Sequence, residues 1–349
     1  MKPSPYGTHR VISPLGVLPQ AAEKLDNTMI PFDNEILIDV EVLNIDSASF
    51  TQIKHACNGD EVTMKKMILS IVEARGKMQN PVTGSGGMLL GKIAAIGKNL
   101  NTSFQVGDEI ATLVSLSLTP LKIETIHKIH MTSDQVDVTA QAILFETGIA
   151  AKMPLDLNRK LALSALDVAG APAQVDKLVN PGDCVVILGA AGKSGLLCAY
   201  QAKKKAGKGG LVVGVLNDPS QRPDLERLGV CDRIVIADAT KALEVMEKVL
   251  SATNGRKADV LINVVNVPNT EMASILTTAD TGIVYFFGMA TSFQKAALGA
   301  EGVASEAKLM IGNGYTQGHA ELTLNLLRES AALREIFTRR YGGKESHEA

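Results

Sequence analysis

The sequence predicts an α/β protein with a β-rich N-terminal domain followed by a doubly wound parallel sheet. Three observations predict this fold class. The chain has 349 residues, which is more than one hydrophobic core usually supports. Short strands separated by glycine-rich turns fill its first third. From about Pro154 onward, strongly apolar strands alternate with helices, which is the order of a parallel sheet.

The first third has the pattern of β structure. Residues Glu35–Leu43 alternate apolar and polar side chains, as a half-buried strand does, and Lys92–Ile96 and Glu109–Val114 are similar. Short strands at this spacing predict a small barrel or sandwich. Met64–Glu73 predicts a short helix whose methionines pack into the core.

The remainder of the chain repeats a unit of strand and helix. Asn158–Ala169 is helical in pattern, and Cys184–Leu188 is a continuous apolar strand of the kind buried in parallel sheets. An amphipathic helix is expected over His319–Tyr341, with fraying beyond it. The other expected strands are Leu211–Leu216, Arg233–Ile236, Asp259–Val264 and Gly282–Phe287. The other expected helices are Leu196–Lys205, Asp224–Gly229, Lys241–Thr253 and Glu271–Thr277.

Composition narrows the possible functions. The net charge is −2, so no basic excess attracts a phosphate backbone, and aromatic residues make up only 4% with no Trp to stack on bases. The apolar runs are far shorter than a membrane span, and the N-terminus lacks the apolar core of a signal peptide. The four cysteines are far apart, which is typical of a reducing compartment. We therefore expect a cytoplasmic enzyme without nucleic-acid or membrane partners.

The strongest chemical signal is a glycine loop between a strand and a helix. Ala190–Gly195 reads A-x-G-x-x-G, one substitution from the dinucleotide-binding fingerprint. Gly192 lets the backbone approach a pyrophosphate, Gly195 lets the helix pack on the strand, and the helix N-terminus attracts the anion. A tight strand-to-helix turn without a ligand is the alternative. The expected cofactor-binding residues of this loop are Gly189, Ala190, Ala191, Gly192, Lys193, Ser194 and Gly195.

The end of the second strand bears on the choice of cofactor. Asp218 follows the glycines by about twenty positions, where NAD enzymes place a carboxylate that accepts the ribose hydroxyls, and Asn217 competes with it. Arg222 would instead receive the 2′-phosphate of NADP, and all three residues are also compatible with a solvated loop. The sequence thus favours NAD, with NADP possible. Val264 and Gly288, at the ends of two later strands, complete the expected site.

The chain resembles the medium-chain dehydrogenase/reductase superfamily over almost its whole length. The N-terminal similarity lies in Gly84–Gly97 and Phe104–Ile110, and the C-terminal similarity lies in the glycine loop and Gly282–Gly288. This resemblance implies a GroES-like catalytic domain over residues 1–153 and a Rossmann domain over 154–315. It also implies a C-terminal helix within 316–349 that packs back toward the catalytic domain, and a homo-oligomer, either a dimer or a dimer of dimers.

More narrowly, the chain is similar to the zinc-free 3,5-diaminohexanoate dehydrogenase family. The distinctive stretches are Tyr6–Ile12, Pro14–Ala22 and Ala165–Gln174. The resemblance implies NAD-dependent oxidative deamination of a small diamino acid, L-erythro-3,5-diaminohexanoate, to 5-amino-3-oxohexanoate and ammonia in lysine fermentation. Two alternatives stay open: a zinc-independent NADPH quinone or enoyl reductase, and a dinucleotide-binding protein without catalysis.

The chain departs from the zinc alcohol dehydrogenases of the superfamily at their metal site. Those enzymes place Cys, His and Cys or Asp around zinc. Near the corresponding positions this chain has Ile45–Asp46–Ser47, then Ser85, then Asp167. Because His and Cys are missing there, and the four-cysteine lobe is missing too, we expect no metal ligands.

Oxidation of an amine without a metal requires a base for the ammonium proton. Asp167 is the first candidate, because the resemblance places it where a metal ligand would face the nicotinamide. An alternative is that Asp167 only caps a helix turn. Asp46 is the second candidate, and the alternative there is that Asn44–Ser49 is a polar loop.

A substrate with two ammonium groups and a carboxylate requires matching charges. Glu73, Glu301 and Glu306 are candidates for the distal ammonium, and Arg75 and Lys77 for the carboxylate, through charge-assisted hydrogen bonds. For any one of these residues, an exposed helix position is the favoured alternative. The sequence therefore predicts the charges of the pocket without fixing which side chains supply them.

Overall fold

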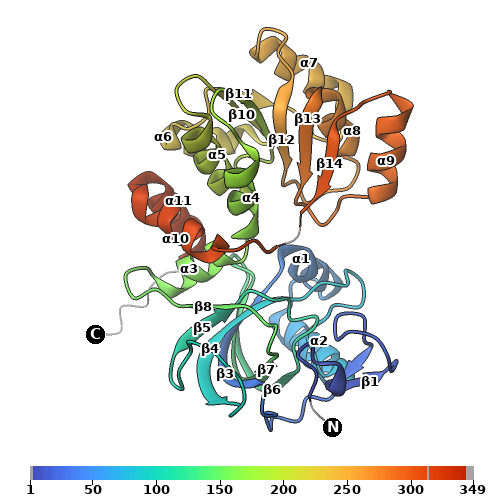
Figure 1. Cartoon of the computed structure of the whole chain (residues 1–349), viewed down its shortest axis with the longest axis vertical. Helices are drawn as coiled ribbons and strands as arrows, with labels where there is room; N and C mark the ends of the chain where they lie inside the picture. The colour runs from blue at the N-terminus through green and yellow to red at the C-terminus, as the bar shows by residue number, and fades with distance from the viewer. Residues whose placement is uncertain (1–2, 313, 343–349) are drawn as a thin grey trace. The chain divides into compact units, whose positions relative to one another are not determined.

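The computed structural model describes residues 3–312 and 314–342 (Figure 1). Its contacts divide the chain into two compact units: one ends at Asp167 and also includes Arg340, Tyr341 and Gly342, and the other spans Val168–Arg339. The first unit is rich in antiparallel β structure and the second contains a parallel sheet between helices. The predicted fold class is confirmed.

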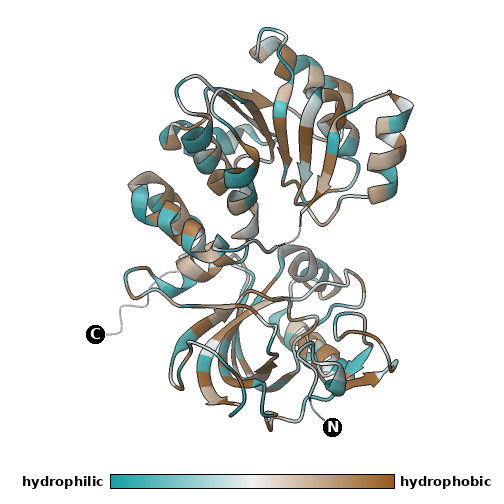
Figure 2. Ribbon diagram, in the orientation of Figure 1, coloured by the Kyte–Doolittle hydropathy of each residue, from teal (hydrophilic) through white to brown (hydrophobic). Residues whose placement is uncertain are grey.

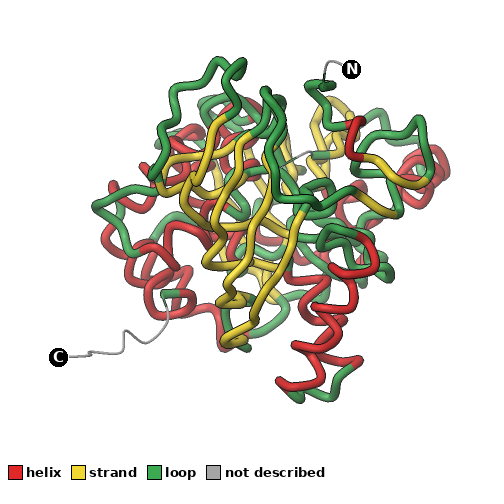
Figure 3. Tube along the Cα trace, turned by 90° about the horizontal axis from the view of Figure 1, so that it is seen from below, coloured by secondary structure: helices red, strands yellow, loops and turns green. Residues whose placement is uncertain are grey.

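The first unit is built on a six-stranded antiparallel sheet, whose long strands run side by side in Figure 3. In spatial order its strands are β6 (Leu121–His130), β7 (Gln135–Leu144), β3 (Ile36–Ile45), β4 (Gly87–Ile96), β5 (Glu109–Thr112) and β8 (Ala150–Lys152). A 3-10 helix, Thr8–Arg10, precedes a small separate sheet of β1 (Val11–Ser13) and β2 (Lys24–Leu25). The β6–β7 pair was not among the strands expected from the sequence.

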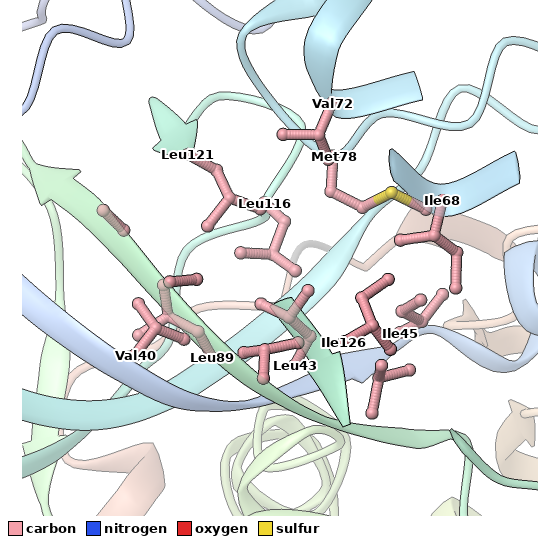
Figure 4. Packing of buried hydrophobic residues seen from close by; sticks show 14 of the residues in the cluster. Val40, Leu43, Ile45, Ile68, Val72, Met78, Leu89, Leu116, Leu121 and Ile126 are labelled. Carbon is pink, nitrogen blue, oxygen red and sulfur yellow. The ribbon is translucent and has the colours of Figure 1, made fainter. Parts of the chain in front are cut away.

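Two helices cover the core of this unit. They are α1 (Ser47–Ala56) and α2 (Glu61–Arg75), and α2 contains the predicted helix Met64–Glu73. Ile68 and Val72 of α2 lie in one buried cluster with Leu43 and Leu89 of the sheet (Figure 4). Burial of this apolar face is what holds the helix on the sheet.

Helix α3 (Arg159–Leu166) belongs to the first unit, so the division falls after Asp167 and not after residue 153 as the sequence suggested. Its side chains explain the difference. The Arg159 guanidinium lies 2.6 Å from a carboxylate oxygen of Glu41 and 2.5 Å from one of Glu109, which are both on strands of the first sheet. These two ion pairs tie α3 to that sheet.

The second unit contains a six-stranded parallel sheet. In spatial order its strands are β11 (Arg233–Ile236), β10 (Leu211–Leu216), β9 (Cys184–Leu188), β12 (Ala258–Asn263), β13 (Thr278–Phe286) and β14 (Lys308–Ile311). These strands are predominantly hydrophobic in Figure 2, as expected for a sheet covered on both faces. The strand order reverses between β9 and β12, which is where such sheets bind ligands.

Helices cover both faces of the parallel sheet. One face packs against α7 (Ala242–Ala252), α8 (Glu271–Thr277) and α9 (Phe293–Gly302). On the other side, α5 (Lys193–Ala206) packs on β9 and β10, and α4 (Gly170–Leu178) packs on α5. A short 3-10 helix η2 (Pro219–Gln221) leads into α6 (Arg222–Leu228). This arrangement is the predicted doubly wound architecture.

The C-terminal segment differs from the prediction of one continuous helix. It forms two helices, α10 (His319–Glu329) and α11 (Ala331–Tyr341). The break lies at Ser330, whose side-chain Oγ accepts a hydrogen bond from the N–H of Leu333 at 3.1 Å and so starts a new helix. Helix α10 packs against α4 and α5 of the second unit.

Two further features concern the described part of the chain as a whole. No helix within residues 3–312 and 314–342 is both long and apolar enough to cross a membrane. All four cysteines are free thiols, and Cys57, Cys184 and Cys198 are buried.

Candidate active site

The glycine loop joins β9 to α5 at the carboxyl edge of the parallel sheet. Gly189 has a φ of +84°, which favours glycine, and its N–H donates to the carbonyl of Val215. A Cβ at Gly195 would lie 2.1 Å from the Gly189 carbonyl oxygen, so only glycine lets α5 pack this closely. Gly192 is the N-cap of α5. The predicted strand–turn–helix is therefore present.

A cavity of about 330 Å³ opens beside this loop. Gly189 and Gly192 line one side of it, and Asn217 and Val264 line others. These residues follow β9, β10 and β12, so the cavity lies at the carboxyl ends of the central strands. This position is where open parallel sheets bind nucleotides.

Gly192 tests whether the cavity fits a dinucleotide. A Cβ at this position would meet no atom closer than the Gly189 carbonyl oxygen at 3.4 Å, an ordinary contact distance. The packing of the protein itself therefore does not require glycine here. A bare backbone at the N-terminus of α5 leaves room for a pyrophosphate and presents N–H groups to it. The loop fits a nicotinamide dinucleotide.

The remaining loop residues differ in their exposure to solvent. Ala190 and Ala191 are buried in the loop. Lys193 and Ser194 are half-buried in the first turn of α5, at the end of the helix that attracts anions.

Asn217 and Asp218, the two residues expected to bind the ribose of the cofactor, have different surroundings. Asn217 lines the cavity, whereas the Asp218 carboxylate accepts a hydrogen bond from the N–H of Ser220 at 2.8 Å and caps η2. The hydrogen bonds from Ser220 hold the pKa of Asp218 below its ordinary value. Arg222 is bound to Glu226 at 2.7 Å and does not line the cavity. The structure thus brings Asn217 to the site and leaves Asp218 and Arg222 at its margin.

Sequence reasoning missed several residues of the cavity. Gln221, Asp238 and Val265 line it. Asp238 follows β11, and this position at the carboxyl end of a predicted strand was the signal that could have found it. Gly288 lies behind the wall, since a Cβ there would be 2.2 Å from the carbonyl oxygen of Val265.

Asp46 lies between β3 and α1 in the first unit, so Asn44–Ser49 is not a polar loop. Its Oδ1 caps α1 by accepting a hydrogen bond from the N–H of Ser49 at 3.1 Å. Its Oδ2 is buried and has no hydrogen-bond partner among the described residues. A buried carboxylate oxygen without a donor is costly, and a ligand N–H group would satisfy it.

Hydroxyl groups gather beside Asp46. The Oγ of Ser49 lies 2.6 Å from the Oγ1 of Thr83 and 2.8 Å from the Oγ of Ser85. The backbone N–H of Asp46 donates to the carbonyl of Gly86 at 3.4 Å, next to Ser85. Two of the three positions compared above with zinc ligands, those of Asp46 and Ser85, therefore come together, and both carry oxygen groups.

Asp167 is the C-cap of α3 and is half-buried. Its backbone N–H donates to the carbonyl of Leu163 at 3.0 Å. A carboxylate at a helix C-terminus faces the negative end of the helix dipole, so this position does not stabilise α3 electrostatically.

The residues expected to bind the charged ends of the substrate are dispersed. Glu73 is exposed on α2, and Arg75 ends that helix with its Nε buried and unbonded within the described part of the chain. Lys77 is fully buried, and its Nζ donates to the carbonyls of Pro19 and Gln20 at 2.7 and 3.3 Å. Burial and the neighbouring Arg75 charge lower the pKa of Lys77 to about 8.

Glu301 and Glu306 lie away from the glycine loop. Glu301 is in the last turn of α9, which runs back from the carboxyl end of β13, and Glu306 precedes β14. Both are exposed at the amino edge of the parallel sheet, whereas the glycine loop is at the carboxyl edge. The structure does not bring them to the cofactor cavity.

Within residues 3–312 and 314–342, no three His, Cys, Asp or Glu side chains are close enough together to hold a metal ion. The groups around Asp46 are hydroxyls, which suit hydrogen bonding to a substrate or a water molecule.

Known structures share this architecture at low sequence identity. An alcohol dehydrogenase of Thermotoga maritima matches 90% of this chain and 86% of its own, with a TM-score of 0.56 and 13% identity. A mycobacterial protein solved with NADPH matches 89% of this chain and 90% of its own, with a TM-score of 0.57 and 16% identity. At these identities the likeness shows the fold, which is that of the medium-chain dehydrogenases and reductases.

Sequence relatives are much closer. A family model described as the L-erythro-3,5-diaminohexanoate dehydrogenase N-terminal domain matches residues 9–154. The L-erythro-3,5-diaminohexanoate dehydrogenase of Acetoanaerobium sticklandii is 57% identical over 343 residues, which cover 98% of this chain and 100% of the relative. The enzyme of that name from Fusobacterium nucleatum is 58% identical over 338 residues, covering 96% and 98%. The chain belongs to the L-erythro-3,5-diaminohexanoate dehydrogenase family.

Proposed function

We propose that this protein catalyses the NAD-dependent oxidative deamination of L-erythro-3,5-diaminohexanoate to 5-amino-3-oxohexanoate and ammonia. The observation that carries the proposal is the identity of 57% over the full length of a relative that bears the name of this dehydrogenase. The glycine loop and its cavity support a nicotinamide dinucleotide as cofactor. The reductase and binding-only alternatives have the fold alone in their favour.

The walls of the cavity support NAD over NADP. When bound, the dinucleotide supplies the acceptor for the hydride that leaves carbon 3 of the substrate. The residues that line the cavity in the described chain include no Lys or Arg, so a 2′-phosphate would meet no cation there. Asn217 and Asp238 offer hydrogen-bond acceptors for sugar hydroxyls.

Asp46 and Asp167 are the proposed groups that handle the ammonium at carbon 3. This ammonium must lose a proton before the carbon can be oxidised, because the nitrogen lone pair stabilises the developing cation. The unpartnered Oδ2 of Asp46 supports this residue as acceptor of that proton. A carboxylate beside the substrate also stabilises the iminium charge that results.

Hydrolysis of the imine completes the reaction. Water adds to carbon 3, a proton moves to nitrogen, and the carbon–nitrogen bond breaks to release ammonia and leave the ketone. The hydroxyls of Ser49, Thr83 and Ser85 can orient the water, since each both donates and accepts hydrogen bonds. The balance is one amine, one water and one oxidised cofactor giving one ketone, one ammonium and one reduced cofactor.

The test is direct assay of the purified protein. L-erythro-3,5-diaminohexanoate is supplied with NAD or NADP, and reduced cofactor and ammonia are measured together. We expect equal amounts of both products and a higher kcat/KM with NAD. L-lysine, which also has two amines but no amine at carbon 3, is the control substrate. Reduction of quinones or enoyl substrates with NADPH, without any amine oxidation, would contradict the proposal.

A further inference from the structure

The segment Pro14–Ala22, named the strap, has no part in the chemistry above, yet polar side chains anchor it firmly. The buried Nζ of Lys77 donates to two strap carbonyls, those of Pro19 at 2.7 Å and Gln20 at 3.3 Å. The Oγ of Ser117 donates to the side-chain Oε1 of Gln20 at 3.0 Å. A buried lysine bound only to carbonyls costs free energy, so its role is to hold this strap in place.

The strap forms one wall of a second cavity, named the strap pocket, of about 180 Å³. Leu18 contributes from the strap, and Val114, Leu118 and Phe145 contribute from the body of the first unit. Tyr6 contributes from the segment before the strap. These side chains are apolar or aromatic. The lining also includes Gln20 and Thr147, whose Oε1 and Oγ1 are engaged by Ser117 and by the carbonyl of Pro5, so the pocket suits an uncharged aliphatic group.

The opposite wall is fixed as well. Gly7 lies so close to Phe145 that a Cβ there would be 2.3 Å from the ring. The N–H and Oγ1 of Thr147 both donate to the carbonyl of Pro5, at 3.2 and 3.0 Å, which holds Tyr6 at the rim. A pocket whose two walls are anchored separately is pre-organised for a ligand.

The rim of the strap pocket leaves apolar surface exposed. Tyr6 is 59% exposed and Leu18 is 56% exposed. Apolar side chains that surround a cavity and remain exposed are typical of a binding site, because a ligand then removes them from water.

The strap pocket lies close to Asp46 in the fold. The carbonyl of Gly86 accepts the N–H of Asp46, and a Cβ at Gly86 would be 2.7 Å from the backbone nitrogen of Ser117. Ser117 in turn binds Gln20 of the strap. Contacts through two backbone segments, at Gly86 and at Ser117, therefore link Asp46 to Gln20 in the lining of the strap pocket.

We propose that the strap pocket is the subsite for the methyl end of the substrate carbon chain, with Lys77 as the positioning residue that holds its strap wall. The inference rests on the proposed function. In 3,5-diaminohexanoate the carboxylate is at one end, and the carbon 6 methyl is the only uncharged end. An apolar pocket beside the proposed base matches that end.

The test compares 3,5-diaminohexanoate with 3,5-diaminopentanoate, which lacks the carbon 6 methyl. For the wild type we expect kcat/KM to be about tenfold higher with the six-carbon substrate, the usual effect of one methyl group in an apolar pocket. In Leu18→Ala this ratio should fall to about threefold or less. Leu15→Ala is the matched control, because Leu15 is in the strap and 80% exposed but does not line the pocket.

Lys77→Met tests the positioning role. We expect KM for the six-carbon substrate to rise about fivefold with kcat nearly unchanged, and the substrate ratio to fall as in Leu18→Ala. A merely structural lysine would instead lower the rates with both substrates equally and leave the ratio at its wild-type value. If Lys77→Met does not fold, Leu18→Ala alone decides.

The outcomes separate the two proposals. If the wild type oxidises neither diamino acid, both the proposed function and the strap pocket are overturned. If it oxidises them but Leu18→Ala and Leu15→Ala keep the same substrate ratio, the strap pocket is overturned and the proposed function stands. A reduced ratio in Leu18→Ala alone supports both.

Discussion

Gly195 lies against the carbonyl oxygen of Gly189, and a Cβ at position 195 would be 2.1 Å from that oxygen. A Cβ at Gly192 would be 3.4 Å from the same oxygen. Two glycines of one loop therefore have different reasons to be glycine. Position 195 is required by packing within the protein, whereas position 192 is left open for a ligand.

The two glycines should respond differently to alanine. Gly195→Ala is expected to lower the free energy of unfolding by about 2 kcal/mol, because the added methyl overlaps backbone atoms. Gly192→Ala should unfold at the wild-type temperature but bind NAD at least about tenfold more weakly, since its methyl occupies the space for the pyrophosphate. Thermal unfolding and calorimetric titration with NAD measure both. Unchanged NAD affinity in Gly192→Ala would show that the loop is only a turn.

Substitutions of Asn217 and Asp218 should differ in their effect on KM for NAD. Asn217→Ala is expected to raise KM for NAD about tenfold, because it removes a hydrogen-bonding group from the cavity wall. Asp218→Asn should change KM for NAD by less than about twofold, since its side chain caps η2 and asparagine caps equally well. Steady-state kinetics with varied NAD decide this. The reverse order of effects would restore Asp218 as the ribose acceptor.

Arg10 and Glu35 form a buried ion pair that should stabilise the first unit. The Arg10 Nε and Nη2 lie 2.7 Å from the two Glu35 oxygens. Burial raises the pKa of Glu35, but the hydrogen bonds from Arg10, the N–H of Phe32 and His9, together with the Arg10 charge, outweigh it and leave this pKa below its ordinary value. The ionised pair thus contributes stability above the ordinary carboxyl pKa of 4.5 and loses it as the pH falls further.

Glu35→Gln is therefore expected to reduce the free energy of unfolding by about 3 kcal/mol at neutral pH. The difference from the wild type should shrink under acid conditions, where Glu35 itself becomes neutral. Urea unfolding at several pH values measures this, with Glu124→Gln as the exposed control. The assignment would be contradicted if Glu124→Gln reduced the free energy of unfolding as much as Glu35→Gln, or if Glu35→Gln did not reduce it.

Lys77 should give a pH dependence of the same sign as Glu35, but at alkaline pH. Its pKa is lowered to about 8 in the folded protein from an ordinary value of 10.5, so between these values the unfolded chain binds more protons. Folding stability from this group then rises as the pH increases from about 8 toward 10.5. Unfolding of the wild type compared with Lys77→Met across this range measures it. A constant difference between the two proteins would mean that Lys77 keeps its ordinary pKa.

The sequence predicted strand bounds best in the central part of the parallel sheet, where strands are buried on both faces. Strands β9, β10 and β11 have the predicted bounds. β9 and β10 form unbroken apolar runs because they are buried on both faces, and the edge strand β11 is apolar after Arg233. The β6–β7 pair was missed because only a few β6 side chains are buried and register shifts after Ile123 and Ile126 break its alternation. Such irregularities are set by the partner strand and are not visible in one segment.

In the candidate site, too, the sequence predicted the features that depend on local spacing and missed those that depend on tertiary contacts. The glycine loop was found because its spacing is local. Asn217 and Asp218 are neighbours, and only the turn into η2 decides which one faces the cavity. Lys77 was expected to bind the substrate carboxylate, but it is held by carbonyls from the strap, distant in sequence. Contacts of this kind depend on the tertiary fold.

Asp46→Asn tests the central claim, that a carboxylate rather than a metal ion handles the substrate amine. Asparagine still caps α1, so the variant should keep the wild-type unfolding temperature. Loss of the base should lower kcat at least about a hundredfold. Asp167→Asn is measured in parallel, since the greater loss identifies the residue that accepts the proton.

The most direct measurement is the rate of NADH formation from 3,5-diaminohexanoate by chelator-treated wild type, Asp46→Asn and Asp167→Asn. We predict full activity in the metal-depleted wild type and a loss of about a hundredfold or more in at least one of the two variants. Activity that disappears on chelation and returns with zinc, or wild-type rates in both variants, would contradict the account.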